Sequence, residues 1–203
     1  MINEPTVFIV DDDDAVRRFL SGLVHSIDLR VEAHASAQDF LDAYEPGCPG
    51  CLLLDVRMPG MSGLELQREL AGHSIDLPVI ILTGHGNVPV AVQAMKAGAV
   101  DFIEKPFNNE LLLDRIQTAV AQSVRADTGQ AKRKEIMGRV ALLTPRERQV
   151  FDLVVAGESN KGVARRLSIS EKTVEIHRAN VMKKMRAKSL ASLVRMAASL
   201  CDD

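Results

Sequence analysis

The chain has 203 residues, 46% of them hydrophobic, and a formal net charge of −2 at pH 7. This length predicts two small domains, and the apolar content is sufficient for a buried core in each. No run of about 18 apolar residues is present, and no charged N-terminal segment precedes an apolar one, so we expect neither a membrane span nor a signal peptide.

The first part of the chain alternates short apolar runs with amphipathic helical patterns. Apolar runs that recur with helices between them are typical of parallel strands in one sheet. The expected strands are residues 7–10, 30–34, 52–54, 79–82 and 100–104, and the expected helices are residues 14–26, 37–44, 63–71, 88–97 and a fifth that begins at Asn108 or Asn109. This order predicts an α/β fold with a doubly wound, five-stranded parallel sheet over residues 1–122.

The next segment, residues 123–138, breaks this alternation. It is polar and charged and has few bulky apolar side chains. We therefore predict a linker that could be helical at either end.

Four helices are expected in the last part, residues 139–203. Thr144 and Pro145 are residue types favoured at a helix N-cap and at the first helical position, and Ser170 is a second N-cap candidate. The predicted helices are residues 145–156, 160–167, 171–185 and 189–200. A short helix, a brief turn and a longer helix are typical of an all-α helix-turn-helix domain.

The small net charge conceals an uneven distribution. Residues 1–123 carry 8 Lys+Arg against 18 Asp+Glu, a net of −10, and residues 124–138 carry 4 against 2, a net of +2. Residues 139–203 carry 13 against 7, a net of +6. An acidic N-terminal part is suited to cation binding, and a basic C-terminal part is suited to nucleic acid.

Polar side chains follow four of the five predicted strands. Asp11 and Asp12 follow the first strand and Asp55 follows the third. Thr83 follows the fourth strand and Lys105 the fifth. Because ligands of open α/β sheets bind at the carboxyl ends of the strands, we expect these groups to converge on one edge.

This combination of groups indicates phosphoryl chemistry. Clustered carboxylates repel one another unless a cation joins them, and Mg²⁺ is held by one or two carboxylates together with water and phosphate oxygens. A carboxylate can attack phosphorus to form an aspartyl phosphate. Lysine and magnesium supply counter-charge for the transferred group, and a hydroxyl can donate a hydrogen bond to it.

At this point the sequence resembles the receiver domain of two-component response regulators. The resemblance covers roughly residues 5–122 and rests on these motifs: Asp11-Asp12, Asp55 with Met58-Pro59-Gly60-Met61-Ser62-Gly63, Thr83-Gly84 and Lys105-Pro106-Phe107. It implies that Asp55 is the phosphoacceptor, that Thr83 and Lys105 bind the phosphoryl group, and that Phe102 is an aromatic switch residue.

The same resemblance implies a site for Mg²⁺ or Mn²⁺. Asp12, Asp55 and the backbone carbonyl of Arg57 would hold the ion, with Asp11 acting through water. Four successive aspartates, residues 11–14, exceed the acidic pair usual in receiver domains.

The helix predicted over residues 171–185 has one apolar face and one polar face. Its apolar face is expected to pack on the other helices and contains Val174, His177, Val181 and Met185. Basic and polar groups near a helix N-terminus can reach phosphates and base edges in the major groove of DNA. The candidate DNA contacts are Lys161 on the preceding helix and Lys172, Thr173, Glu175, Ile176, Arg178, Ala179 and Lys183.

A second resemblance, to the LuxR-type helix-turn-helix, covers roughly residues 139–200. It rests on Leu143-Thr144-Pro145-Arg146-Glu147-Arg148, Asn160-Lys161, Thr173-Val174-Glu175-Ile176-His177-Arg178 and Lys183-Lys184-Met185. It implies that residues 171–185 form the recognition helix and that Glu147 is structural. Gly162 and Arg165 depart from the small or apolar residues that are commoner at their positions.

Together the two halves resemble FixJ-type response regulators of the NarL/FixJ family. This resemblance implies a transcription factor, not an enzyme, that a sensor histidine kinase phosphorylates. Phosphorylation would promote homodimerisation through residues 88–105 and binding to promoter DNA, with RNA polymerase as a further partner. The odd number of cysteines, three, favours a reducing cytoplasm.

Other interpretations stay open. Asp11 and Asp13 form a D-x-D after a strand, as in haloacid dehalogenase-type phosphatases, but Ala15 stands where that family has Thr or Val. The receiver could also be a structural domain that has lost phosphorylation, although the complete set of site positions argues against it. Cys48 and Cys51 form a C-x-x-C that could be a redox or zinc motif. Because a strand follows it and no second pair exists, we favour a simple turn.

Overall fold

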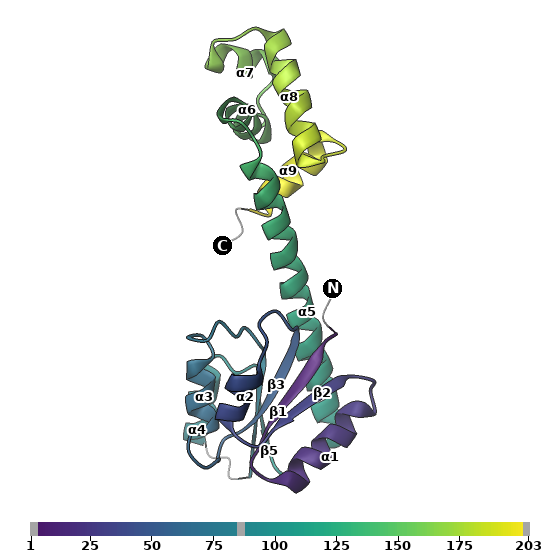
Figure 1. Ribbon diagram of the computed structural model, residues 1–203, viewed down its shortest axis with the longest axis vertical. Helices are drawn as coiled ribbons and strands as arrows, with labels where there is room; N and C mark the ends of the chain where they lie inside the picture. Colours follow the sequence, from purple (N-terminus) through teal and green to yellow (C-terminus); the bar gives the residue numbers. More distant parts are fainter. Residues whose placement is uncertain (1–3, 85–87, 201–203) are drawn as a thin grey trace. The chain divides into compact units, whose positions relative to one another are not determined.

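The computed structural model describes residues 4–84 and 88–200 (Figure 1). The chain divides into two compact units, one that ends at Asp127 and one that begins at Thr128. Among the helices of these described ranges, none is apolar over enough of its length to cross a membrane.

The first unit alternates strands and helices from its start. Its elements are β1 (Thr6–Val10), α1 (Asp14–His25), β2 (Arg30–His34), α2 (Ala37–Ala43), β3 (Gly50–Asp55), α3 (Gly63–Glu69), β4 (Val79–Thr83), α4 (Val88–Lys96), β5 (Asp101–Glu104) and the first part of α5 (Asn109–Ala141). The strands are all parallel and lie in the order β2-β1-β3-β4-β5. The predicted doubly wound, five-stranded parallel sheet is therefore confirmed.

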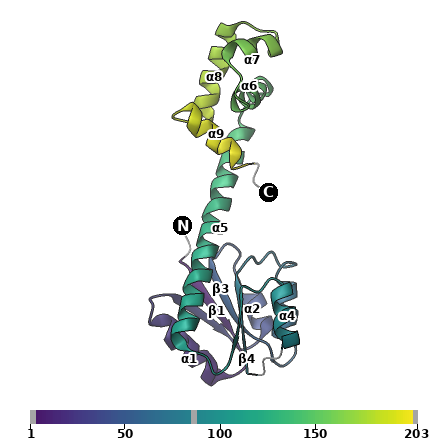
Figure 2. The same cartoon turned by 180° about the vertical axis from the view of Figure 1, so that it is seen from behind.

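Helices cover both faces of this sheet, as Figures 1 and 2 show. On one face, Leu20 of α1 and Leu112 of α5 pack on strand residues such as Leu53. On the other face, a second core joins Phe40 of α2, Leu66 of α3 and Ala94 of α4 to strand residues that include Phe8, Leu52, Leu54 and Ile81. Successive residues of β3 alternate between the two cores because strand side chains have a period of two. The sheet is thus buried on both faces, which leaves its carboxyl edge as the place for polar groups.

The segment predicted as a linker, residues 123–138, lies inside α5 and is helical throughout. Half of its residues are Ala, Arg, Lys, Gln and Glu, which are good helix formers, and it contains no proline. The segment is also held near both ends. Ser123 Oγ accepts a hydrogen bond from the Gly50 N–H at 3.0 Å in the first unit, and Ile136 is buried in the core of the second.

The second unit is all-α, as predicted. After the last part of α5 it contains α6 (Pro145–Val155), α7 (Asn160–Leu167), α8 (Glu171–Met185) and α9 (Leu190–Ala198). Each of these four helices begins after a Ser or Thr N-cap, namely Thr144, Ser159, Ser170 and Ser189. One core joins them, with Ile136 of α5, Val150 and Phe151 of α6, Val163 of α7, Val174 and Val181 of α8 and Leu193 of α9.

Candidate functional site

Asp55 is the last residue of β3, the central strand of the sheet. On its two sides, β1 ends directly before Asp11 and β4 ends at Thr83. Asp11 is 2% exposed, Asp55 is 8% exposed and Thr83 is 1% exposed. Polar side chains from three neighbouring strands are therefore buried at the carboxyl edge, where the sequence predicts them.

Lys105, which follows β5, joins two of these carboxylates. Its Nζ donates hydrogen bonds to Asp11 Oδ2 at 2.6 Å and to Asp55 Oδ1 at 2.8 Å. The other carboxylate oxygen of Asp55 accepts a hydrogen bond from the Arg57 backbone N–H at 2.6 Å. Hydrogen bonds with one or two charged partners are stronger than neutral ones. Lys105 thus compensates two buried negative charges at once.

Burial and charge act on this cluster in opposite directions. Burial raises the pKa of the Asp11 carboxyl group above its ordinary value, although the hydrogen bond from Lys105 works to lower it. Burial by itself would lower the pKa of Lys105, but the hydrogen bonds to Asp11 and Asp55 outweigh it and the pKa is raised. Lys105 is therefore a cation at neutral pH and can pair with a phosphoryl group.

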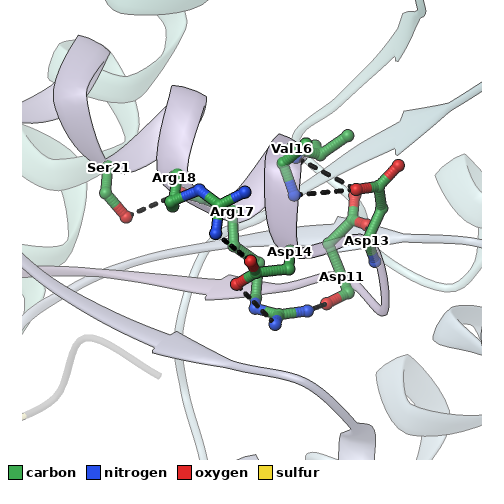
Figure 3. A network of polar contacts seen from close by, with 8 residues as sticks. Asp11, Asp13, Asp14, Val16, Arg17, Arg18 and Ser21 are labelled. Atoms are coloured by element: carbon green, nitrogen blue, oxygen red, sulfur yellow. Dashed lines mark hydrogen bonds and ion pairs between the residues drawn. The ribbon is translucent and has the colours of Figure 1, made fainter.

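The four successive aspartates have different environments, and Figure 3 shows three of them, Asp11, Asp13 and Asp14. The Asp13 carboxylate caps α1 by accepting hydrogen bonds from the backbone N–H groups of Ala15 and Val16. Asp14, in the first turn of α1, forms ion pairs with Arg17 and Arg18. These two aspartates therefore stabilise the first turn of α1. Asp11 and Asp12 are left for the site; Asp11 is buried and Asp12 is exposed.

The donor groups at this edge fit a hard cation. Mg²⁺ is usually held by one or two carboxylates, and carbonyl oxygens and water complete its octahedral shell. Asp11 and Asp55 supply two buried carboxylates. In the part of the chain that the structure describes, no three His, Cys, Asp or Glu side chains already form a metal-binding group. Water and backbone oxygens, such as the Arg57 carbonyl, would have to complete the shell.

The two predicted switch residues come from strands on one side of β3. Thr83, at the end of β4, lies one position beyond Leu82, the register partner of Asp55. Phe102 of β5 pairs in register with Ile81 and packs, half-buried, against the core that also contains Ala94 of α4. A change in the packing of Phe102 would therefore reach the core layer that holds α4.

Helix α8 has the two faces that the sequence predicts. Val174, Val181 and Met185 are buried in the core of the second unit, and His177 is half-buried. Six of the predicted DNA contacts are exposed: Lys161, Lys172, Glu175, Ile176, Ala179 and Lys183. Ile176, a large apolar side chain on this face, is 56% exposed.

The other two predicted contacts, Thr173 and Arg178, are half-buried and hydrogen-bonded within the protein. Thr173 Oγ1 lies 2.7 Å from the hydroxyl oxygen of the N-cap residue Ser170. Arg178 Nη1 donates a hydrogen bond to Asn160 Oδ1, at the start of α7, at 2.7 Å. Asn160 was not among the predicted contacts, because a side-chain pair between two helices leaves no local sequence signal.

Glu147 fixes α8 against α6. It is 4% exposed, forms a reciprocal capping box with Thr144, and accepts a hydrogen bond from Lys184 Nζ at 2.6 Å. The hydrogen bond from Lys184, followed by that from the Thr144 backbone, lowers the pKa of Glu147 to about 2. At the end of α8, Arg139 Nη1 donates to the Met185 carbonyl oxygen at 3.1 Å. The structural role expected for Glu147 thus has a geometric basis.

The C-x-x-C motif is not a disulfide. Cys48 and Cys51 are free thiols. Cys51 is buried in the core under α1 and α5, and this burial raises the pKa of its thiol to about 12. Cys48 packs against the core on the opposite face of the sheet. The two thiols therefore face different layers, which fits the expectation of a turn that enters a strand.

Two family models match the chain. The response regulator receiver domain matches residues 7–117. The DNA-binding domain described as bacterial regulatory proteins of the luxR family matches residues 141–197. Together the matches account for both units of the structure.

Characterised relatives match nearly the whole length. The transcriptional regulatory protein FixJ of Azorhizobium caulinodans is 49% identical over 94% of this chain and 90% of its own. FixJ of Rhizobium meliloti is 50% identical over 95% and 94%. Among solved structures, the response regulator StyR has a TM-score of 0.86 and 42% identity, covering 96% of this chain and 98% of its own. Full-length FixJ from B. japonicum has a TM-score of 0.60 and 45% identity, covering 98% of each chain.

Proposed function

This chain belongs to the response regulators that join a receiver domain to a luxR-type DNA-binding domain, and from that premise we propose that a histidine kinase transfers a phosphoryl group to Asp55. The family consists of transcription regulators of two-component systems. The observation that carries the proposal is the bridge from Lys105 to the buried carboxylates of Asp11 and Asp55. This bridge supports the proposal because it brings carboxylate groups and a lysine ammonium group together at the edge of the sheet.

In the transfer step, a carboxylate oxygen of Asp55 attacks phosphorus, and the bond from phosphorus to the imidazole nitrogen of the kinase phosphohistidine breaks. The product is an acyl phosphate with a charge of about −2, which replaces the single negative charge of the Asp55 carboxylate at a buried site. Lys105 exchanges its contact with Asp55 for one with a phosphoryl oxygen. The Thr83 hydroxyl donates a hydrogen bond to a second oxygen, and Phe102 repacks against its core.

Receiver domains generally bind Mg²⁺ at the phosphorylation site. In this chain, Mg²⁺ or Mn²⁺ held by Asp12, Asp55 and the Arg57 carbonyl, with Asp11 through water, would neutralise charge on the phosphoryl group. Two features support this set. The side chains of Asp13 and Asp14 already form hydrogen bonds and ion pairs within α1. Burial of Asp11 and Asp55 strengthens the attraction of their carboxylates for a cation.

A surface next to Lys105 is suited to the kinase. A groove of about 370 Å³ lies between α1 and the residues after β5, and Phe19, Lys105 and Phe107 are part of its lining. Phe19 is 50% exposed, and its ring centroid lies 6.3 Å from that of Phe107. Phe107 is partly buried, so the pair is partly exposed. A partly exposed aromatic pair beside a charged site is suited to binding another protein. We place the kinase contact here.

The dimer face includes α4 and β5. Large apolar side chains are exposed along this segment: Val88, Val92, Met95 and Val100. Val88 is 76% exposed, and such a patch is costly unless another surface covers it. Because Phe102 of β5 packs in the core that contains Ala94 of α4, phosphorylation at Asp55 can alter this face. Receiver dimerisation would then pair two DNA-binding domains on promoter half-sites.

In the DNA-binding part, Lys161, Thr173, Arg178 and Lys183 contact phosphates, Lys172 adds positive charge, and Glu175, Ile176 and Ala179 meet base edges. The exposed polar face of α8 and the net charge of +6 on residues 139–203 support this. We keep residues 1–122 as the receiver but begin the DNA-binding part near Thr128. Ile136 is buried in the core of that part, and Arg139 donates a hydrogen bond to the Met185 carbonyl oxygen at the end of α8.

The protein acts where the promoter DNA and RNA polymerase are, which is the cytoplasm of a bacterial cell.

The test of the whole function compares DNA affinity before and after treatment with acetyl phosphate and Mg²⁺. Wild-type protein should bind its target duplex more tightly after treatment, and the Asp55→Asn variant should not change. Equal gains in both proteins would reject Asp55 as the acceptor.

A further inference from the structure

One side-chain contact connects the two helices of the helix-turn-helix. Asn160 is the first residue of α7, and Arg178 lies in the middle of α8. The Arg178 guanidinium donates from Nη1 to Asn160 Oδ1 at 2.7 Å. Both residues are half-exposed, so the contact lies at the surface of the second unit.

The partner of Arg178 differs from those of two other arginines in the second unit. Arg148 is paired with the Asp152 carboxylate and Arg166 with the Glu158 carboxylate, so a negative charge offsets each of these cations. Asn160 offers a neutral amide oxygen instead. The contact with Asn160 orients the guanidinium without cancelling its charge.

A guanidinium group carries five N–H donors in a planar fork, and one hydrogen bond to Asn160 leaves donors for a second partner. The arginine side chain has many rotamers, and it loses rotamer entropy when it binds an anion from solution. A hydrogen bond that holds the fork beforehand reduces the loss on binding. Lys161, next to Asn160, and Ala179, next to Arg178, are both exposed, so the fork lies within the surface expected to face DNA.

We propose that Asn160 is a positioning residue for DNA binding: it holds the Arg178 guanidinium so that the remaining donors meet a backbone phosphate. Asn160 thereby acts on DNA through Arg178. This inference rests on the proposed function, in which α8 faces DNA. It also explains why a neutral residue stands at the start of α7, where an acidic residue would be favoured by the helix dipole.

The test is a double-mutant cycle on the full-length, phosphorylated protein. Affinities of wild type, Asn160→Ala, Arg178→Ala and the double variant are measured against salt, on a duplex selected from a random pool by the wild-type protein and on an unselected duplex. Arg178→Ala should weaken binding to both duplexes and lower the log–log salt slope by about one. Asn160→Ala should weaken the affinity for both duplexes by about threefold to tenfold, because a guanidinium without this hydrogen bond loses more rotamer entropy when it binds phosphate. In the Arg178→Ala background, Asn160→Ala should have no further effect.

Two further variants separate positioning from folding. Asn160→Asp keeps the acceptor oxygen and should keep the thermal unfolding midpoint, yet it should weaken DNA binding because its charge offsets that of Arg178. Gln149→Ala is the matched control, since Gln149 Oε1 accepts a similar bond from Arg146 Nη1, at 2.8 Å, within α6. Gln149→Ala should leave DNA affinity unchanged.

Equal losses from Asn160→Ala in both backgrounds would overturn the inference, as would unchanged affinity in Asn160→Ala. A wild-type protein that binds neither duplex would instead reject the proposed function itself. The two failures are therefore distinguishable in the same experiment.

Discussion

The Lys105 amine lies 2.8 Å from Asp55 Oδ1, within hydrogen-bonding distance of the proposed phosphoacceptor. Lys105 comes from beyond the edge strand β5 and Asp55 from the central strand, so this contact ties the middle of the sheet to the β5 side. Phosphorylation of Asp55 would replace a carboxylate with a phosphoryl group of greater charge. The lysine must then move, which couples the chemistry at β3 to the surface of α4 and β5.

The first prediction concerns the metal ligands. Asp12→Ala should weaken Mg²⁺ binding more than Asp14→Ala, because Asp14 is engaged by Arg17 and Arg18. Mg²⁺ binding should also weaken as pH falls, and it should begin to weaken above the ordinary aspartate range, because burial raises the pKa of Asp11. Titration of Mg²⁺ at several pH values, followed by the NMR shift of the Arg57 amide, measures both effects. Equal losses in the two variants would mean that the wrong aspartate was chosen.

The second prediction concerns the kinase surface. Phe19→Asp places a charge in the groove beside Lys105, so phosphotransfer from the histidine kinase should slow by at least about tenfold, the effect of roughly 1.4 kcal/mol in transition-state binding. Labelling by acetyl phosphate, which needs no protein contact, should keep its wild-type rate. The matched control is Met137→Asp, at an exposed apolar position in the second unit. Slowing of both donors by Phe19→Asp would show that the substitution damages the site and not the docking surface.

The third prediction concerns the dimer. Met95→Glu introduces charge into the apolar patch on α4, and Lys96→Glu reverses the charge of its neighbour. Both variants should accept phosphate as wild type does but remain monomeric, and Met95→Glu should be the more severe because it removes apolar contact area. Sedimentation velocity of the phosphorylated proteins measures this. If phosphorylated wild type is itself monomeric at high concentration, dimerisation is not the mechanism, and release of the DNA-binding domain must suffice.

The fourth prediction concerns Glu147, whose pKa is lowered from 4.5 to about 2. A carboxyl group with a depressed folded-state pKa contributes stability that is complete above its unfolded-state pKa and is lost as pH falls through the folded value. Glu147→Gln should therefore lower the free energy of unfolding of the second unit by about 1–3 kcal/mol at pH 7. The difference from wild type should shrink between pH 4.5 and about 2.

Hydrogen exchange of α8 peptides over this pH range measures the local free energy of unfolding. Asp152→Asn, which breaks the exposed pair with Arg148, is the control and should cost less than about 0.5 kcal/mol. A Glu147→Gln penalty that stays constant down to pH 2 would show that its charge does not stabilise α8.

The sequence predicts much of the sheet and its site because both depend on local patterns. Asp55 and Thr83 each end an apolar run, and parallel strands bring such ends to one edge. The N-cap candidates Thr144 and Ser170 likewise indicate where two of the C-terminal helices begin. The N-cap role of Asp13 and the ion pairs of Asp14 could not be predicted, because a carboxylate that caps a helix and one that binds a cation have the same residue type.

Two features depend on contacts between distant residues and were therefore missed. Residues 123–138 were expected to form a linker because they are polar, but Ser123 and Ile136 hold them in a helix through contacts with different units. Asn160 gains its partner only when α7 and α8 pack together. Composition gives no sign of either contact.

The most direct measurement is the intact mass of the protein after incubation with acetyl phosphate and Mg²⁺. Wild-type protein should gain the mass of one phosphoryl group, and Asp55→Asn should gain none, because the amide lacks the nucleophilic carboxylate oxygen. Asp13→Asn, which leaves the buried cluster of Asp11, Asp55 and Lys105 intact, should be labelled as wild type is. Full labelling of the Asp55→Asn variant, or none of the wild type, would contradict the claim that Asp55 is the phosphoacceptor.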